Sequence, residues 1–347
     1  RSLEAILTKI VYTNTMKIFC SGIGGIGLSA YAAQQAARGH TVMGSDRADS
    51  PLLDDLRSQG ITIVSSQDSV QIPVDTDLFV YSEAIPAESP ERQFAREHQI
   101  RSISYFQALG ELVKGAYVIA VCGTHGKSST TAMVAKMLID AGKDPSVVVG
   151  TKMKELNGRN WRMGQSDFFV VEACEYRRSF LHIHPSIVLL TNVDGDHFDA
   201  YGTIEEYRRA FVDFISLLPE NGQVVLHGAD RDAQAVAVRS KKTVVDADVF
   251  LDVVLGTPGA HMRQNAQLAL ALADVLSIDA SVARTSLSTF SGTWRRMQVK
   301  GTLDQDIVVI DDYGHHPVEI KATLAAMKEA YAGRRIVCVF QPHTHDR

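Results

Sequence analysis

The stretch Tyr117–Thr131, with the sequence YVIAVCGTHGKSSTT, decides the fold of this chain. Its first six residues predict a buried strand, and after a glycine-containing turn we expect a helix from Thr131 to Ala141, ended by Gly142. Gly-Lys-Ser in such a turn is typical of a loop whose backbone N–H groups cradle phosphates. Lys127 would reach the β and γ oxygens, and the Ser128 hydroxyl would bind Mg²⁺.

This loop is a shortened variant of the pattern G-x-x-x-x-G-K-[ST]. The pattern asks for a glycine at Val121, and the sequence has it at Gly123 instead. A turn with an incidental lysine explains the segment poorly, because strand, Gly-Lys-Ser and helix follow one another in register. The sequence therefore predicts an ATP site formed by Gly123, Thr124, His125, Gly126, Lys127, Ser128 and Ser129.

A second glycine-rich turn lies near the start of the chain. Gly22–Gly27 (GIGGIG) matches G-x-G-x-x-G between an expected strand at 17–21 and an expected helix at 28–38, and Asp46 ends the next strand. The glycines let a phosphate approach a helix N-terminus, and the acidic residue is placed to bind a ribose hydroxyl. A turn that binds nothing is the alternative. The motif favours a phosphate ligand without deciding between NAD and another nucleotide, such as a UDP-sugar.

Composition and charge exclude several classes of protein. The 347 residues are 45% hydrophobic and 22% charged, which is globular and argues against a disordered or collagen-like chain. At about 150 residues per domain, the length predicts two to three domains. A net charge of −5 without a basic block argues against nucleic acid as the main partner.

Membrane insertion and secretion are also disfavoured. No apolar run reaches about 18 residues, so we expect no membrane-spanning helix. Residues 1–15 carry no secretory signal. Four cysteines lie far apart without a C-x-x-C pair, which argues against a disulfide framework or zinc finger and fits a reducing cytoplasm.

Strands alternate with helices along the whole sequence, which predicts α/β domains with mostly parallel sheets. Thr203 and Glu206 form a capping-box pattern at the start of one of the helices. Besides those named above, we expect strands at 41–45, 61–64, 78–81, 168–171, 187–190, 223–226, 307–310 and 335–340, and helices at 204–218, 263–276 and 317–331.

Polar residues follow two of these strands. Glu172 ends the strand 168–171, and His197 follows the strand 187–190 within Thr191–His197. Sites in open α/β sheets form beyond the carboxyl ends of strands, so both side chains could face the phosphates. A carboxylate suits Mg²⁺ and a neutral imidazole suits a second ion. A solvated strand end and an ordinary loop histidine are the alternatives.

Later segments offer further candidates. An arginine of Trp294–Arg296 could stabilise the γ-phosphate, although a linker arginine pair is an equal alternative. Asp311–Pro317 and Gln341–His343 follow predicted strands and suit contact with substrate or nucleotide. His261 and Asn265 could cap a helix or contact a base.

Two nucleotide-type loops in one chain favour a ligase. A dehydrogenase has no use for Lys127, and an ATPase has no use for the first glycine turn. In these features the chain resembles the Mur ligases of peptidoglycan synthesis. The matching pieces run in order along nearly the whole chain: Gly22–Gly27, Gly123–Ser128, Glu172–Arg178, Thr191–Asn192 with Asp196–His197, His261–Asn265, Gly292–Arg296, Asp311–Pro317 and Phe340–His343.

The resemblance implies an α/β fold of three parts. It implies a Rossmann-like UDP-sugar-binding domain at 1–113, a central P-loop ATP-binding domain at 114–291, and the start of a third, Rossmann-like α/β domain at 292–347 for the amino acid. It implies UDP-sugar contacts from Gly22, Ile23, Gly24, Gly25, Ile26, Gly27, Asp46 and Ser82.

The resemblance also implies roles around ATP. Ser128 and Glu172 would hold one Mg²⁺ and His197 a second ion, while Lys127 with Arg295 or Arg296 would neutralise the transferring phosphoryl group. Asn265 and His261 would lie near adenine and Asp312 near the ribose. Residues on the amino-acid side would be Glu175, Arg177, His315, His343 and Arg347.

The activity implied is the ATP- and Mg²⁺-dependent joining of L-alanine to UDP-N-acetylmuramate through an acyl phosphate, by a cytoplasmic monomer or homodimer. Within the family, reattachment of a murein tripeptide to UDP-N-acetylmuramate is the alternative. An NAD-dependent dehydrogenase and a non-catalytic nucleotide-binding fragment are alternatives from other classes.

Some features depart from the family pattern. Ser128 stands where threonine is usual, and it supplies the same hydroxyl. The stretch between Val245 and Gly259 is shorter than expected, so residues could be missing there. The sequence also stops soon after the third domain begins, which predicts that part of the amino-acid site lies beyond it.

Overall fold

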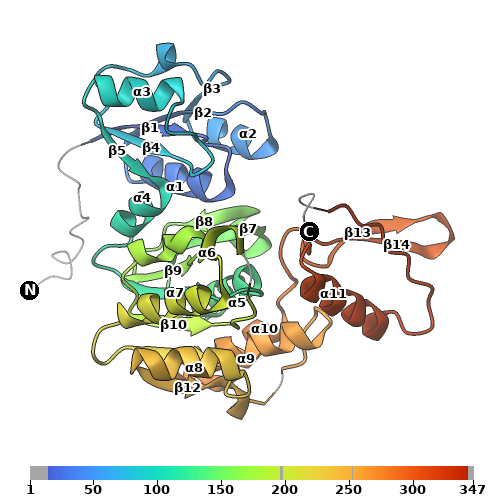
Figure 1. The fold of residues 1–347 in the computed structure, drawn as a ribbon. Coiled ribbons are helices and arrows are strands. Elements are labelled where there is room, and N and C mark those ends of the chain that lie inside the picture. The colour runs from blue at the N-terminus through green and yellow to red at the C-terminus, as the bar shows by residue number, and fades with distance from the viewer. Residues whose placement is uncertain (1–14, 196–197, 252, 343–347) are drawn as a thin grey trace, which may run out of the picture. The chain divides into compact units, whose positions relative to one another are not determined.

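A computed structural model of the chain describes residues 15–195, 198–251 and 253–342, and it divides into two compact units, up to Leu112 and from Val113 onward (Figure 1). Each unit is built around its own parallel sheet. The described residues include no helix with both the length and the apolar character needed to cross a bilayer.

The first unit holds a five-stranded sheet in the order β3-β2-β1-β4-β5, parallel throughout. Phe19 and Phe79 stack in its core with ring centroids 5.9 Å apart. This is the doubly wound arrangement predicted for the N-terminal part. The elements are β1 (Lys17–Ser21), α1 (Ile26–Ala37), β2 (Thr41–Ser45), α2 (Pro51–Ser58), β3 (Thr62–Val64), β4 (Leu78–Tyr81), α3 (Pro90–Glu97), β5 (Arg101–Ser104) and α4 (Tyr105–Leu112).

Local sequence signals start two helices of this unit. Ser50 and Ser89 are N-caps whose hydroxyls accept from Leu53 N and Arg92 N, and each is followed by proline at the first helical position. Serine at the N-cap and proline just inside it are both preferred there. Neither α2 nor α3 was among the predicted helices, although each carries this local signal.

The second unit is centred on a seven-stranded sheet in the order β12-β11-β10-β6-β9-β7-β8. All neighbours pair in parallel except β7 and β8, which are antiparallel. Its strands are β6 (Tyr117–Cys122), β7 (Ser146–Met153), β8 (Arg159–Arg162), β9 (Phe168–Glu172), β10 (Ile187–Leu190), β11 (Gln223–Leu226) and β12 (Thr243–Asp246).

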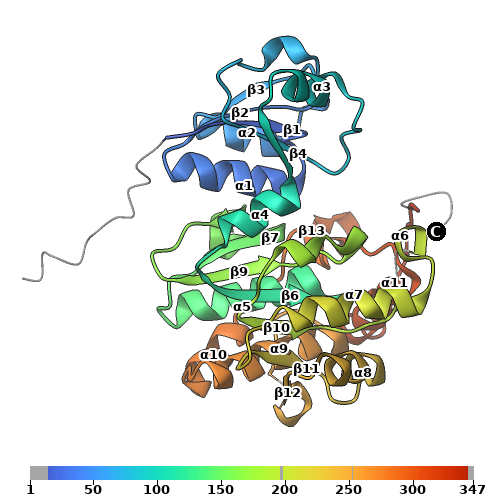
Figure 2. The same cartoon turned by 60° about the vertical axis from the view of Figure 1, so that its left-hand side comes forward.

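Helices pack against this sheet in two groups, α5 with α9 and α10, and α7 with α8 (Figures 1 and 2). The first group shares an apolar core with β6, β9 and β10 through side chains such as Val121, Met133 and Leu268. The helices are α5 (Lys127–Asp140), α6 (Phe198–Tyr201), α7 (Ile204–Ser216), α8 (Arg231–Ser240), α9 (Ala260–Val275) and α10 (Ala280–Ser288).

The last described part of the second unit is a hairpin followed by a helix: β13 (Gln298–Leu303), β14 (Ile307–Asp311) and α11 (Pro317–Ala330). The two strands are antiparallel. The expectation of parallel pairing therefore holds for the two large sheets apart from β8, and it does not hold for this hairpin.

Several predicted elements were shifted or wrong. The helix after the phosphate loop begins at Lys127 rather than Thr131, and α9 begins at Ala260 rather than Arg263. The strand expected at 335–340 is wrong: those residues form no regular element, and Val339 is 95% exposed. A strand gains its hydrogen bonds and burial from a neighbour, and this run has neither.

The expected cap of α7 is confirmed, because the Thr203 hydroxyl accepts from Glu206 N at 3.2 Å. The possible capping of α9 by His261 or Asn265 is wrong. Gly259 is its N-cap, with a positive φ of 105°, and no side chain caps it.

Candidate active site

The phosphate loop joins the end of β6 to the start of α5, near the middle of the seven-stranded sheet. Gly126 is the N-cap of α5 with φ 82°, a left-handed conformation that favours glycine. A Cβ there would also lie 2.7 Å from Asn265 Oδ1. Because glycine offers no capping side chain, the first N–H groups of α5 are left for an anion.

Residues after β10 fix the shape of this loop. The Asn192 side chain accepts from His125 N and donates to His125 O, both at 3.0 Å. Thr191 Oγ1 donates to the same carbonyl at 2.6 Å, and the Thr124 hydroxyl meets the Tyr207 hydroxyl at 2.9 Å. The loop is therefore held from outside, as a preorganised anion site requires.

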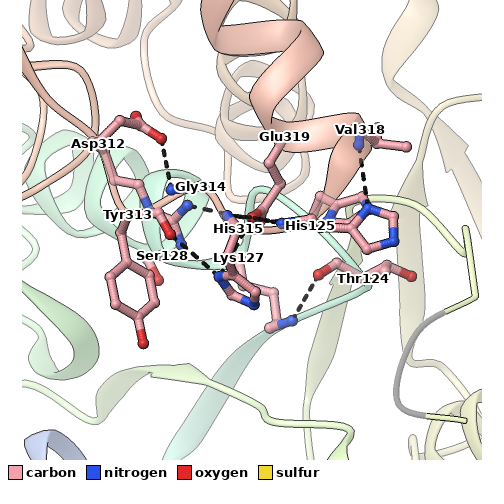
Figure 3. A network of polar contacts seen from close by, with 12 residues as sticks. Thr124, His125, Lys127, Ser128, Asp312, Tyr313, Gly314, His315, Val318 and Glu319 are labelled. Atoms are coloured by element: carbon pink, nitrogen blue, oxygen red, sulfur yellow. Dashed lines mark hydrogen bonds and ion pairs between the residues drawn. The ribbon is translucent and has the colours of Figure 1, made fainter. Parts of the chain in front are cut away.

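Lys127 is folded back into the loop. Its Nζ donates to Gly123 O at 2.7 Å, to Thr124 O at 3.0 Å and to Glu175 Oε1 at 3.0 Å (Figure 3 shows the Thr124 contact). Burial works to lower the pKa of the amine, but Glu175, Cys174 and Glu172 outweigh it, so the pKa lies above its usual value. The lysine stays charged and has the buried Glu175 as counter-ion.

Oxygen ligands for a cation gather beside the loop. Ser128 Oγ donates to Glu172 Oε1 at 3.0 Å, and Gly150 N donates to Glu172 Oε2 at 2.8 Å. A Cβ on Gly150 would lie 2.8 Å from both carboxylate oxygens, so the glycine permits this approach. A hydroxyl and a carboxylate fit Mg²⁺, which favours oxygen ligands and keeps several waters.

His197, the third predicted metal ligand, lies outside the described residues, as do His343 and Arg347. Within the described ranges, no group of three or more His, Cys, Asp or Glu side chains is arranged to hold a metal ion.

The ring of His125 connects the loop to the start of α11 (Figure 3). Its Nδ1 lies 3.4 Å from Glu319 Oε1, and its Nε2 lies 3.3 Å from Asp194 Oδ2. The His316 ring lies against it, with centroids 4.7 Å apart. Residues far apart in sequence thus meet at the mouth of the phosphate loop.

The two candidate arginines form ion pairs with different carboxylates, while both guanidinium groups lie over the Tyr313 ring. Arg296 Nη1 lies 3.7 Å from Glu319 Oε1, in the cluster beside the phosphate loop. Arg295 Nε lies 3.3 Å from Asp311 Oδ2, and its guanidinium lies over the ring of Tyr313. Arg295 has a left-handed φ of 55°, and the chain turns sharply there. Arg296 is therefore the arginine placed beside the phosphate loop.

The residues expected near adenine and ribose lie close to this cluster. Asn265 is buried against Gly126 of the loop. Both Asp312 carboxylate oxygens accept from backbone, from Met297 N at 2.8 Å and Gly314 N at 2.7 Å. Burial lowers the pKa of the nearby His261, and Asp312 opposes that shift. The lowered pKa favours the neutral form of the His261 ring, which suits contact with a base.

On the expected amino-acid side, Arg177 and Arg178 both have left-handed φ values, 49° and 60°. Strained backbone of this kind persists where the surroundings hold it. Here Arg178 pairs with Asp213, and its N–H contacts the Tyr201 hydroxyl. His315 donates its backbone N–H to Glu319 Oε2 at 3.2 Å, so it belongs to the cluster around the phosphate loop.

The first unit has a cavity of about 460 Å³ at the carboxyl ends of β1, β2 and β4. Gly24 N donates to Asp46 Oδ2 at 2.8 Å, so Asp46 lies against the glycine turn. Ile23 is fully buried and packs in the core, so only its backbone is available to a ligand. The cavity is lined by Gly22, Gly24, Gly25, Asp46, Arg47, Ala48, Ser50, Gln67, Ser82, Ala84, Ile85, Pro86, Ser89 and Glu91.

Comparison with known proteins identifies the family. Residues 17–117 match the model "Mur ligase family, catalytic domain", residues 121–252 the "Mur ligase middle domain", and residues 295–347 the "Mur ligase, glutamate ligase domain". The chain is a member of the Mur ligase family.

Similar Mur ligases support this membership. UDP-N-acetylmuramate–L-alanine ligase of Clostridium acetobutylicum is 37% identical over 360 residues, covering 95% of this chain and 78% of the relative. The enzyme of the same name from Desulforapulum autotrophicum is 39% identical over 365 residues, with 97% and 79% covered.

Solved structures of Mur ligases agree. UDP-N-acetylmuramate-alanine ligase of Thermotoga maritima has a TM-score of 0.84 at 30% identity, over 94% of this chain and 81% of that one. A murein peptide ligase of Psychrobacter arcticus has a TM-score of 0.80 at 26% identity, over 95% and 81%. The predicted fold class is thereby confirmed.

Some contacts of this Mur ligase were not found from the sequence. Glu319, Tyr207 and Gly150 each contact the phosphate loop or Glu172, although none belongs to the loop motif. For Glu319 a signal existed, because it stands three residues after His316 at the start of a helix, where a capping residue is expected. Tyr207 and Gly150 carry no such signal.

Proposed function

We propose that the chain is an ATP-dependent ligase that joins L-alanine to UDP-N-acetylmuramate. The observation that carries this proposal is the pair of glycine turns, one in each unit. The second turn leads into Lys127 and Ser128, and Ser128 contacts Glu172 at the end of β9. Relatives that bear this enzyme's name are 35–39% identical to the chain over nearly its whole length. A dehydrogenase would leave the phosphate loop and its partly buried lysine unexplained.

The reaction has two steps. The muramate carboxylate oxygen attacks the γ-phosphorus, and the bond between that phosphorus and the β,γ-bridging oxygen breaks. This step forms the acyl phosphate and releases ADP. The amine of L-alanine then attacks the acyl carbon, releasing phosphate and a proton as the amide forms. Two anions must approach each other in the first step, so the protein has to supply positive charge.

This chain's residues suit that task. The N–H groups at the start of α5 and the Lys127 amine would face phosphate oxygens, and Arg296 would supply a further cation. Ser128 and Glu172 would hold Mg²⁺, which neutralises charge on the phosphates when it is bound. His197 is proposed as a ligand of a second ion.

The other assignments follow the same proposal. Residues 1–113 would form the UDP-sugar domain, 114–291 the ATP domain and 292–347 the start of the amino-acid domain. Gly22–Gly27, Asp46 and Ser82 would bind the UDP-sugar. Asn265, His261 and Asp312 would serve the nucleoside of ATP. Residues proposed for the amino-acid side are Glu175, Arg177, His315, His343 and Arg347.

One experiment tests the activity and its alternatives. ADP release is measured with Mg²⁺, ATP and UDP-N-acetylmuramate, adding L-alanine in one reaction and murein tripeptide in another. We expect release with L-alanine, together with formation of the amide. Release only with the tripeptide would assign the recycling reaction, and release with neither would reject catalysis by this chain. Titration with NAD, followed by nicotinamide absorbance, checks the dehydrogenase alternative.

The different surroundings of the two arginines give a prediction. Arg296→Gln should lower kcat by about 10²-fold, because it removes a cation beside the phosphates. Arg295→Gln is the matched control and should change kcat by less than about threefold, since that side chain pairs with Asp311. ADP release under saturating substrates measures both. Equal losses in the two variants would contradict the assignment of Arg296.

A further inference from the structure

Glu319 joins three segments at the mouth of the phosphate loop. It lies in the first turn of α11, and its side chain is only 15% exposed. One carboxylate oxygen, Oε2, accepts from His315 N at 3.2 Å and His316 N at 3.5 Å, which closes the capping box of the helix. The other oxygen, Oε1, faces His125 Nδ1 and Arg296 Nη1 (Figure 3 shows the His125 contact).

The carboxyl group of Glu319 is ionised. Burial works to raise its pKa, but His125, Arg296 and the backbone N–H of His315 outweigh it and hold the pKa well below its usual range. A full negative charge therefore lies among the groups that would receive a triphosphate. This negative charge opposes binding of the triphosphate. We therefore expect the Glu319 carboxylate to serve the site in another way.

The two carboxylate oxygens of Glu319 have different partners. Oε2 belongs to the helix, so it fixes where the carboxylate stands. Oε1 then offers a fixed acceptor to a ring from the phosphate loop and to a guanidinium that follows Gly292–Thr293. The Arg296 side chain is long and rotatable, and the His125 ring is carried by a loop, so a shared acceptor restricts both groups.

We propose that Glu319 is a positioning residue, which holds the His125 ring and the Arg296 guanidinium at the mouth of the phosphate loop. The proposal rests on the function proposed above, since it assumes that ATP binds this loop. It extends that function to a residue outside the loop motif, on the helix after the hairpin β13–β14.

Two opposite effects follow from this arrangement. Removing the negative charge strengthens the attraction between the site and ATP. Removing the charged acceptor also loosens His125 and Arg296, so the transition state is stabilised less. ATP affinity should therefore rise while kcat falls. Simple loss of folded structure would lower both, so this split identifies a positioning role.

The test compares three variants of α11. Glu319→Gln keeps a capping oxygen but loses the charge, and it should tighten binding of a non-hydrolysable Mg·ATP analogue by about threefold while lowering kcat by about tenfold. Glu319→Asp keeps the charge but shortens the side chain, so it should lower kcat and leave affinity unchanged. Glu329→Gln is the matched control, because Glu329 lies on the same helix as Glu319 but pairs at 2.8 Å with Arg263 of α9.

The outcomes separate the two proposals. Calorimetry measures analogue affinity, ADP release measures kcat, and thermal melting checks that each variant folds. Weaker or unchanged affinity in Glu319→Gln, or the same result in Glu329→Gln, would overturn the role of Glu319. If Glu319→Gln does not fold, the test rests on Glu319→Asp. An unchanged kcat in Glu319→Asp would then overturn the positioning role of Glu319. Failure of the unmodified protein to bind the analogue would instead count against the proposed function.

Discussion

Replacing Lys127 with methionine will lower ATP turnover by about 10³-fold, because the amine is the cation that we propose reaches the β and γ oxygens. Without nucleotide, that amine is held by Gly123 O, Thr124 O and Glu175 Oε1. It is thus already placed in the loop when the phosphates arrive. UDP binding should be unchanged, because the cavity proposed for it lies in the first unit.

The same substitution will also destabilise the second unit. Glu175 is fully buried, and Lys127 is its ion-pair partner at 3.0 Å. Removing one partner of a buried pair leaves an uncompensated charge, which costs about 3 kcal/mol or more. A loss of turnover in Lys127→Met alone could therefore reflect loss of folded protein.

A double variant separates these effects. In Lys127→Met with Glu175→Gln, the buried charge is removed together with its partner, so the denaturation midpoint should return toward that of the unmodified protein. Turnover should stay lost, because the amine is still absent. Denaturant unfolding and ADP release measure the two quantities. If turnover returned in the stable double variant, the role of Lys127 in phosphoryl transfer would be refuted.

The phosphate loop could be predicted because its signal is contiguous. Strand, glycine turn, Gly-Lys-Ser and helix occupy one short segment, and each part is encoded locally. The contact between Ser128 and Glu172 could also be expected, since parallel strands end at the same edge of a sheet. In both cases a local pattern and one general rule of α/β sheets suffice.

The choice between Arg295 and Arg296 could not be made from the sequence. The two arginines are adjacent in the sequence, and Arg295 has a left-handed φ that turns the chain between them. Arg295 therefore pairs with Asp311, and Arg296 pairs with Glu319. The strand expected at 335–340 failed for a related reason. An apolar run predicts a strand, but the pairing partner that would stabilise it is not a property of that run.

Gly123 should be the least replaceable glycine of the phosphate loop. Its φ is 133°, and an added Cβ would overlap Thr191 Oγ1 and lie 2.9 Å from Asn192 O. Thr191 and Asn192 are the residues that hold the backbone of His125. Gly123→Ala must therefore either displace the loop or break those hydrogen bonds, and we expect ATP affinity to fall by at least about tenfold.

Gly142→Ala is the matched control for this change. Gly142 also has a positive φ, 68°, but its added Cβ would meet nothing within 4 Å. Backbone strain of about 1–2 kcal/mol applies at Gly142 and is larger at Gly123, whose φ of 133° lies outside the left-handed region. Overpacking of about 1–3 kcal/mol applies only at Gly123. Denaturant midpoints should therefore fall further in Gly123→Ala, and only that variant should lose affinity for the ATP analogue. Equal affinities for the ATP analogue in the two variants would contradict the prediction. They would show that the loop tolerates an added Cβ at Gly123 without loss of binding. A greater loss in Gly123→Ala would show that the backbone conformation of Gly123 and its close contacts with Thr191 and Asn192 together shape the phosphate loop.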